Sequence, residues 1–184
     1  MATTTTKLMT FAEFEQLPNT PEGFPYELRH GELFKVAPPK YDHFMIQQVL
    51  RDLLDKAAAG AGRAFTEVGF RAMPDQEFRV ADVAYASNER WTQSKSAQYF
   101  FGAPEMVIEV LSPSNTATEM LDKEKLCLEN GCREFWLVDI ERRQVKVSTP
   151  DGHTITYRSG QEIPLPFFHG GRLAVDSIFT PAEG

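Results

Sequence analysis

The chain has few cysteines, no long apolar segment and no excess of positive charge. Only two of its 184 residues are cysteines, and Cys127 and Cys132 form neither a C-x-x-C pair nor a zinc-finger pattern. We expect both to be small buried side chains. No segment reaches the roughly 18 apolar residues of a membrane span, and the first residues lack the apolar core of a signal peptide. These absences predict a cytoplasmic protein with no membrane partner.

The formal net charge is −7. Proteins that coat nucleic acid depend on many Lys and Arg contacts with phosphate, so this charge argues against such a protein. It does not exclude a nuclease, because metal-binding acids lower the net charge and a local basic groove can coexist with an acidic body.

The pattern of apolar residues predicts an α/β (α+β) domain with a mixed β-sheet. We expect a disordered tail over 1–9 and a single domain over 10–180. A hairpin is expected over 24–36, and polar residues 87–98 are expected to form a connection. Helices are expected over 10–17, 41–59 and 116–130, and strands over 63–73, 77–86, 105–111, 134–140, 145–147, 154–157 and 173–175. The strand over 105–111, the next helix and the strand over 134–140 fit one right-handed crossover.

Two acidic residues interrupt apolar strands. Asp82 lies within Val80-Ala81-Asp82-Val83-Ala84, and Glu109 within Val107-Ile108-Glu109-Val110. A buried carboxylate is costly unless it is paired, protonated or bound to a metal. Magnesium uses oxygen ligands, commonly one or two carboxylates with water and phosphate. Asp82 and Glu109 are therefore candidate ligands of Mg²⁺ or Mn²⁺, with the Val110 carbonyl as a third.

Lysines of the following helix offer two interpretations. Lys123 is either a functional cation beside the carboxylates or a surface partner of Glu119, which precedes it by four residues. Lys125 lies on the opposite edge of the apolar arc and is an accessory candidate. Glu27 is either a further acidic group of the site or a hairpin residue paired with Arg29 or Lys35. His43 is either an accessory site residue or a capping residue in the first turn of its helix.

Several of these segments resemble the Uma-two family. The resemblance rests on Val107-Ile108-Glu109-Val110-Leu111-Ser112-Pro113-Ser114 and on Gly131-Cys132-Arg133-Glu134-Phe135-Trp136-Leu137-Val138-Asp139. Tyr26-Glu27-Leu28-Arg29-His30-Gly31-Glu32-Leu33, followed by Pro38 and His43, is similar to its N-terminal signature. This is a large bacterial family with the restriction-endonuclease-like, PD-(D/E)XK, fold.

The resemblance implies a restriction-endonuclease-like mixed sheet flanked by helices, with an extra N-terminal hairpin and extra C-terminal strands. It implies Asp82 and Glu109 as metal ligands, and it favours Lys123 as the functional lysine. The chain departs from the family pattern at a few positions. Leu111 stands where the motif usually has its lysine, Ala81 replaces a proline, and Cys127 and Cys132 replace a tyrosine and a valine.

Two functions of different classes follow. The first is a metal-dependent endonuclease that hydrolyses phosphodiester bonds in DNA, using Asp82, Glu109, Lys123 and Glu27. The second is a catalytically weak or inactive nuclease fold that binds nucleic acid or regulates another process. Aromatic residues in and beside the polar connection further predict an exposed patch and a homodimer. These residues are Trp91, Tyr99, Phe100 and Phe101.

Overall fold

A seven-stranded mixed β-sheet organises the molecule. The computed structural model describes residues 8–18, 26–36, 38–95, 99–113 and 115–179. The sheet has the order β5-β3-β4-β6-β7-β8-β9, and two separate hairpins pair β1 with β2 and β10 with β11. In this sheet β6 pairs with β7 and β3 with β5 in parallel, and the other neighbouring strands are antiparallel. This is the mixed α+β layout expected from the sequence.

The boundaries of the elements follow the sequence pattern closely, with a few additions. The strands are β1 (Tyr26–Arg29), β2 (Glu32–Lys35), β3 (Gly62–Arg71), β4 (Arg79–Ser87), β5 (Phe100–Phe101), β6 (Met106–Val110), β7 (Glu134–Asp139), β8 (Gln144–Ser148), β9 (Thr154–Arg158), β10 (Glu162–Leu165) and β11 (Gly171–Ala174). The helices are α1 (Phe11–Phe14), α2 (Tyr41–Ala58), α3 (Asn88–Ser94), α4 (Ala117–Glu129) and α5 (Val175–Phe179).

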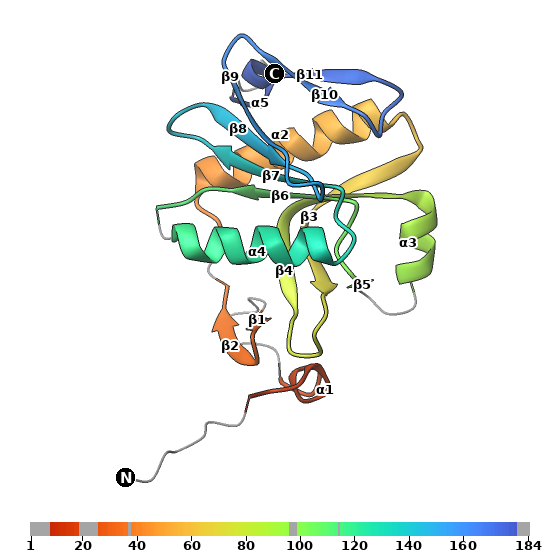
Figure 1. Cartoon of the computed structure of the whole chain (residues 1–184), viewed down its shortest axis with the longest axis vertical. Helices are drawn as coiled ribbons and strands as arrows, with labels where there is room; N and C mark the ends of the chain where they lie inside the picture. The colour runs from red at the N-terminus through yellow and green to blue at the C-terminus, as the bar shows by residue number, and fades with distance from the viewer. Residues whose placement is uncertain (1–7, 19–25, 37, 96–98, 114, 180–184) are drawn as a thin grey trace.

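Helices cover both faces of the sheet (Figure 1). On one face, Leu50 and Leu54 of α2 pack with Ile108 and Trp136 and with apolar residues of the C-terminal hairpin. On the other face, Leu126 and Cys127 of α4 belong to a second core with Phe135. β6, α4 and β7 form the expected crossover, since β6 and β7 run parallel. Both cysteines are buried and free, as expected.

The segment over 87–98 differs from its expected form. It contains α3, whose N-terminus is capped by the Ser87 side chain accepting from the Arg90 N–H. Serine is a favoured residue at the N-cap of a helix. Ser87 is therefore a local sequence signal for the start of α3. Residues 96–98 of this segment lie outside the described residues.

The aromatic residues near α3 have structural roles, which corrects the expectation of a free surface patch. Phe100 is 1% exposed and belongs to the core beneath α4. Trp91 is half-buried and packs against that core. Phe101 is exposed. The four rings therefore do not form one exposed patch, although Trp136 is a core residue as expected.

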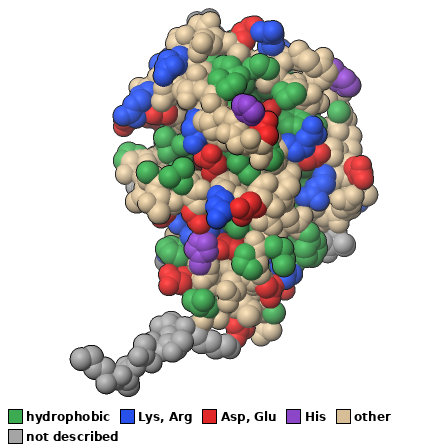
Figure 2. Space-filling model, in the orientation of Figure 1, with side chains coloured by type: hydrophobic (Ala, Val, Ile, Leu, Met, Phe, Trp, Pro, Cys, Tyr) green, Lys and Arg blue, Asp and Glu red, His purple; other side chains and the backbone are tan. Residues whose placement is uncertain are grey.

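The N-terminal tail is described only in part. Residues 1–7 of the segment expected to be disordered lie outside the described residues, and the Met9 N–H donates to the Gly31 carbonyl. Within the described residues, no helix is both long and apolar enough to span a membrane. On the face drawn in Figure 2, acidic and basic side chains alternate rather than gather into one basic stripe.

Candidate active site

The centre of the candidate site is a local break in the sheet. The β3–β4 ladder pairs Thr66 with Val83 and Val68 with Ala81, but it skips Glu67 and Asp82 between them. Glu67 has a left-handed backbone, with φ of 54°, which is uncommon for a residue other than glycine and is found where the surroundings enforce it. The break therefore coincides with an acidic residue on each strand.

The break also reverses the alternation of side chains along β4. Ala81 and Ala84 both belong to the core beneath α4, while Val83 belongs to the core beneath α2. In a regular strand, residues three apart face opposite sides of the sheet. Asp82 is thereby turned toward α2, although the alternation counted back from Ala84 would place it toward α4.

Asp82 is held by groups from α2 and β6. Its Oδ2 accepts a hydrogen bond of 2.7 Å from the Val110 N–H, and Gln47 Nε2 donates to its Oδ1 at 3.2 Å. His43 Nε2 lies 3.1 Å from Oδ2. Val110 was expected to act through its carbonyl, and the contact that the structure shows is made by its N–H.

Glu109 reaches the same break from the side of α4. Its Oε2 accepts from Lys123 Nζ at 2.7 Å, and its Oε1 lies 3.4 Å from the Asp82 N–H. The Asp82 carboxylate thus takes an N–H from β6, while the Glu109 carboxylate faces an N–H of β4. The two acids meet in the gap between β4 and β6, each supported by a different helical layer.

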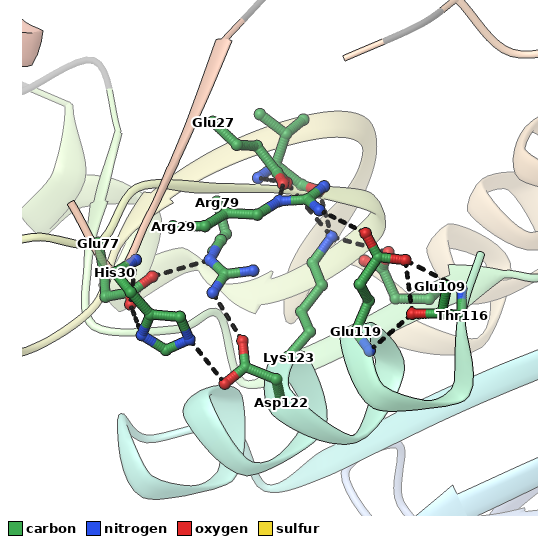
Figure 3. A network of polar contacts seen from close by, with 11 residues as sticks. Glu27, Arg29, His30, Glu77, Arg79, Glu109, Thr116, Glu119, Asp122 and Lys123 are labelled. Atoms are coloured by element: carbon green, nitrogen blue, oxygen red, sulfur yellow. Dashed lines mark hydrogen bonds and ion pairs between the residues drawn. The ribbon is translucent and has the colours of Figure 1, made fainter. Parts of the chain in front are cut away.

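Lys123 is a buried cation surrounded by acceptors (Figure 3). Besides Glu109, its Nζ donates to the Val80 carbonyl at 2.7 Å and lies 3.5 Å from Glu27 Oε1. The surface pair with Glu119 is not formed. Glu119 instead caps α4 with Thr116 and pairs with Arg29 at 3.1 Å.

Glu27 belongs to the buried cluster and also pairs with Arg29, so both interpretations of this residue hold in part. It is 2% exposed, its Oε1 accepts from the Val80 N–H at 2.8 Å, and its Oε2 accepts from Arg29 Nε at 2.6 Å. Lys125 does not join the cluster. Its side chain is exposed and lies 3.9 Å from Glu129, which corrects its assignment as an accessory residue.

The pKa shifts in this cluster follow from burial and from opposing charges. Burial is the main cause that raises the pKa of Glu109 to about 8. The ammonium of Lys123 lowers this pKa, whereas the negative charges of Asp82 and Glu27 raise it further. Burial alone would lower the pKa of Lys123, but the charges of Glu109, Glu27 and Asp82 raise it above its usual value. Lys123 is therefore a charged donor and not a base.

Burial and neighbouring charges also shift the pKa values of Glu27 and His43. Burial raises the pKa of Glu27, but Lys123, Arg29 and the Val80 N–H lower it by more. Burial lowers the pKa of His43, but its contact with Asp82 and the charges of Asp82 and Glu67 raise it overall. Glu27 is therefore an ionised partner of the cations, and His43 is a favoured proton carrier beside Asp82.

The donor set fits a hard divalent cation. The groups that converge on the gap are carboxylate oxygens, and magnesium commonly uses one or two such groups with water. Gln47 is 1% exposed, and its Oε1 has no hydrogen-bond partner among the described residues. In the described part of the chain, no group of three or more His, Cys, Asp or Glu side chains is arranged to hold a metal ion by itself. Solvent or substrate would supply the remaining ligands.

Three site residues were missed by the sequence reasoning. Glu67 accepts from Gln47 Nε2 at 2.7 Å, which links it to Asp82 through one amide. Glu67 interrupts a strand as Asp82 does, so the same criterion would have found it. Gln47 lies on the apolar arc of α2 with Leu50 and Leu54, where a polar residue is a signal. Arg79 has one partner nearby in the sequence, Glu77, but its second partner, Asp122, comes from α4 and is set by the tertiary fold.

The fold and the carboxylate–lysine cluster place the chain in the restriction-endonuclease-like class. A solved chain described as a "putative nuclease belonging to DUF820" from Anabaena variabilis matches with a TM-score of 0.82 and 25% identity, covering 93% of this chain and 97% of that chain. A family model described as "Putative restriction endonuclease", Uma2, matches residues 11–176. The chain belongs to this family, which confirms the resemblance found in its motifs.

Two further comparisons add no argument about function. A chain of a DrdV–DNA complex matches with a TM-score of 0.37 and 14% identity, covering 58% of this chain and 9% of that chain. No curated protein matches this chain.

Proposed function

We propose that the protein is a metal-dependent endonuclease that hydrolyses phosphodiester bonds in DNA with Mg²⁺ or Mn²⁺. The observation that carries this proposal is the meeting of Asp82 and Glu109 in the gap between β4 and β6, with Lys123 Nζ 2.7 Å from Glu109. Two carboxylates and a lysine from neighbouring elements are the groups that such hydrolysis needs. Family membership supports the reaction class.

In this proposal, Asp82, Glu109 and the Val110 carbonyl hold the cation. A bound divalent ion supplies an activated water and neutralises charge on the phosphate. Lys123 favours the ionised form of Glu109 and fixes its orientation, since its ammonium is already bound to that carboxylate and to the Val80 carbonyl. Glu27 balances the charge of Lys123, and His43 orients Asp82.

One observation favours the alternative of an inactive or weak nuclease fold. Lys123 is 5% exposed, and its close partners are groups of the protein itself. A lysine that contacts phosphate directly must be reachable from the substrate. If Lys123 never leaves Glu109, the cluster is a structural ion pair, and the fold serves as a nucleic-acid-binding or regulatory module.

A nicking assay separates the two functions. The full chain with supercoiled DNA and Mg²⁺ or Mn²⁺ is expected to yield nicked circles. EDTA and Asp82→Asn are each expected to abolish the product. Lys125→Ala is the matched control, because Lys125 is exposed on the same helix and its nearest acid is Glu129. Cleavage that survives Asp82→Asn would refute this site, whereas DNA binding without any cleavage would establish the alternative.

A further inference from the structure

A pocket of about 880 Å³ has Glu67, one residue of the candidate site, in its lining. It lies between the exposed side chains of β3 and helix α3, and β5 lines one end. Pockets of roughly 300–1,000 Å³ with apolar walls and a few polar groups are the usual form of small-ligand sites. The lining side chains used below are Arg63, Phe65, Glu67, Trp91, Lys95 and Phe100.

The aromatic wall of the pocket is held rigidly. Trp91 lies between Phe65 and Phe100, with ring centroids 4.6 Å apart in both pairs and interplanar angles of 66° and 72°. Trp91 Nε1 also donates to the Arg63 carbonyl at 3.3 Å. Phe65 is the outermost ring and is 40% exposed. A fixed ring with a free face is suited to stacking, because little side-chain freedom is lost on binding.

Charged groups are placed along the same wall. Arg63 and Phe65 lie two residues apart in the regular part of β3, so their side chains stand on one face of the strand, and Glu67 follows at the break in the ladder. Lys95 adds a second cation at the other side of the pocket. Two cations beside an aromatic ring match the phosphate and the base of a nucleotide.

Glu67 connects this pocket to the proposed catalytic carboxylates. It lines the pocket, and Gln47 Nε2 donates both to Glu67 at 2.7 Å and to Asp82 at 3.2 Å. One amide therefore separates the end of the pocket from the proposed metal ligand.

We propose that this pocket binds an unpaired nucleobase, which stacks on Phe65 while Arg63 and Lys95 contact its phosphates. The inference rests on the endonuclease function proposed above and narrows its substrate to single-stranded or locally unpaired DNA. In a regular duplex the faces of the bases are covered by their neighbours, so an aromatic wall has access only to a base outside the stack. A chain with a net charge of −7 also attracts duplex backbone weakly, which leaves stacking as the larger contribution.

Binding of a labelled oligothymidylate to the full chain, measured by fluorescence anisotropy in EDTA, tests the pocket without requiring cleavage. Stacking on an aromatic side chain contributes about 1–3 kcal/mol per base, so Phe65→Ala is expected to raise Kd by at least about fivefold. Phe65→Leu, which keeps apolar bulk without a π face, is expected to show the same loss. Phe65→Tyr is expected to retain binding, and Phe101→Ala is the control, since Phe101 is exposed outside the lining.

The outcomes distinguish this inference from the proposed function. The assignment of the pocket to an unpaired base would be refuted by an unchanged Kd in Phe65→Ala. It would also be refuted if a blunt duplex of the same length bound equally tightly. Both results would count even if plasmid DNA is cleaved. If Phe65→Ala loses binding and neither the wild type nor any variant cleaves DNA, the assignment of the pocket to a base is supported and the endonuclease function is refuted. If Phe65→Ala instead converted a dimer to a monomer in light scattering with no change in Kd, the pocket would be an interface between copies of the chain.

Discussion

Lys123 is the residue on which the candidate site depends most directly. Its ammonium contacts two buried acidic side chains, Glu109 at 2.7 Å and Glu27 at 3.5 Å. Such a cluster need not be more stable than an apolar one, but removing one member leaves uncompensated buried charge. Stability and function are therefore tied together at this position.

We expect Lys123→Met to lower the free energy of unfolding by about 3–5 kcal/mol, because the ionised Glu27 loses its counter-charge and Glu109 loses its hydrogen-bond donor. Adding Glu109→Gln to that variant should recover part of the loss, giving a coupling energy above about 1 kcal/mol in a double-mutant cycle. Urea denaturation measures all three variants. Lys125→Ala should change stability by less than about 0.5 kcal/mol. Equal effects of Lys123→Met and Lys125→Ala would contradict the buried cluster.

Glu109 gives the site a pH dependence. Burial raises its pKa to about 8, so metal must displace a proton below that pH. Mg²⁺ or Mn²⁺ affinity is expected to rise by about tenfold per pH unit from pH 6 to pH 8 and to level off above it. Calorimetry on the wild type and Glu109→Gln checks this. A flat affinity profile in the wild type would mean that Glu109 is ionised throughout or is not a ligand.

The raised pKa of Glu109 also determines how the stability of the metal-free protein changes with pH. The unfolded Glu109 ionises near the ordinary glutamate pKa of 4.5, while the folded form holds its proton up to a pKa of about 8. Between these values the folded state binds more protons, so this group makes the metal-free protein less stable as pH rises. Glu109→Gln should reduce that slope.

At the scale of elements, the N-terminus of α4 joins the N-terminal hairpin to the site. Thr116 and Glu119 form a capping box, in which each side chain contacts the other residue's backbone N–H. Glu119 also pairs with Arg29 of β1 at 3.1 Å, and His30 Nε2 lies 2.9 Å from Asp122 of α4. These contacts hold β1, and with it Glu27, against the helix that carries Lys123.

Thr116→Ala is expected to lower the free energy of unfolding by about 1 kcal/mol, since the helix loses its capping oxygen. Thr118→Ala is the matched control, because Thr118 is exposed in the first turn of the same helix and outside the capping box. It should leave stability unchanged within about 0.5 kcal/mol. Thermal denaturation compares the two, and similar melting temperatures would argue against the capping box.

At the scale of the whole molecule, association stays a prediction. Twofold dimers are the commonest oligomers. We expect a homodimer at micromolar concentration, measured by light scattering. Phe65→Ala should leave the mass unchanged, because the pocket beneath that ring is assigned to a base. A monomer at that concentration would refute the homodimer.

The sequence by itself determined most strands of the sheet and the helices α1, α2 and α4, because these depend on local periodicity. The apolar run of β4, the apolar arc of α2 and the motif around Glu109 each report on their own segment. The same local reasoning identified Asp82 and Glu109, since a carboxylate inside an apolar strand is costly wherever that strand lies.

Only the tertiary structure decided how these groups meet. The break at Glu67 and Asp82, the burial of Lys123 between Glu109 and Glu27, and the pairing of Arg29 with Glu119 join segments far apart in the chain. Glu124 lies among apolar residues of α4, and the sequence of that helix does not explain its charge. Its partner is Lys146 of β8, whose Nζ lies 2.7 Å from the Glu124 carboxylate. Periodicity describes one segment at a time, whereas a buried charge is stable only through partners that folding brings from elsewhere.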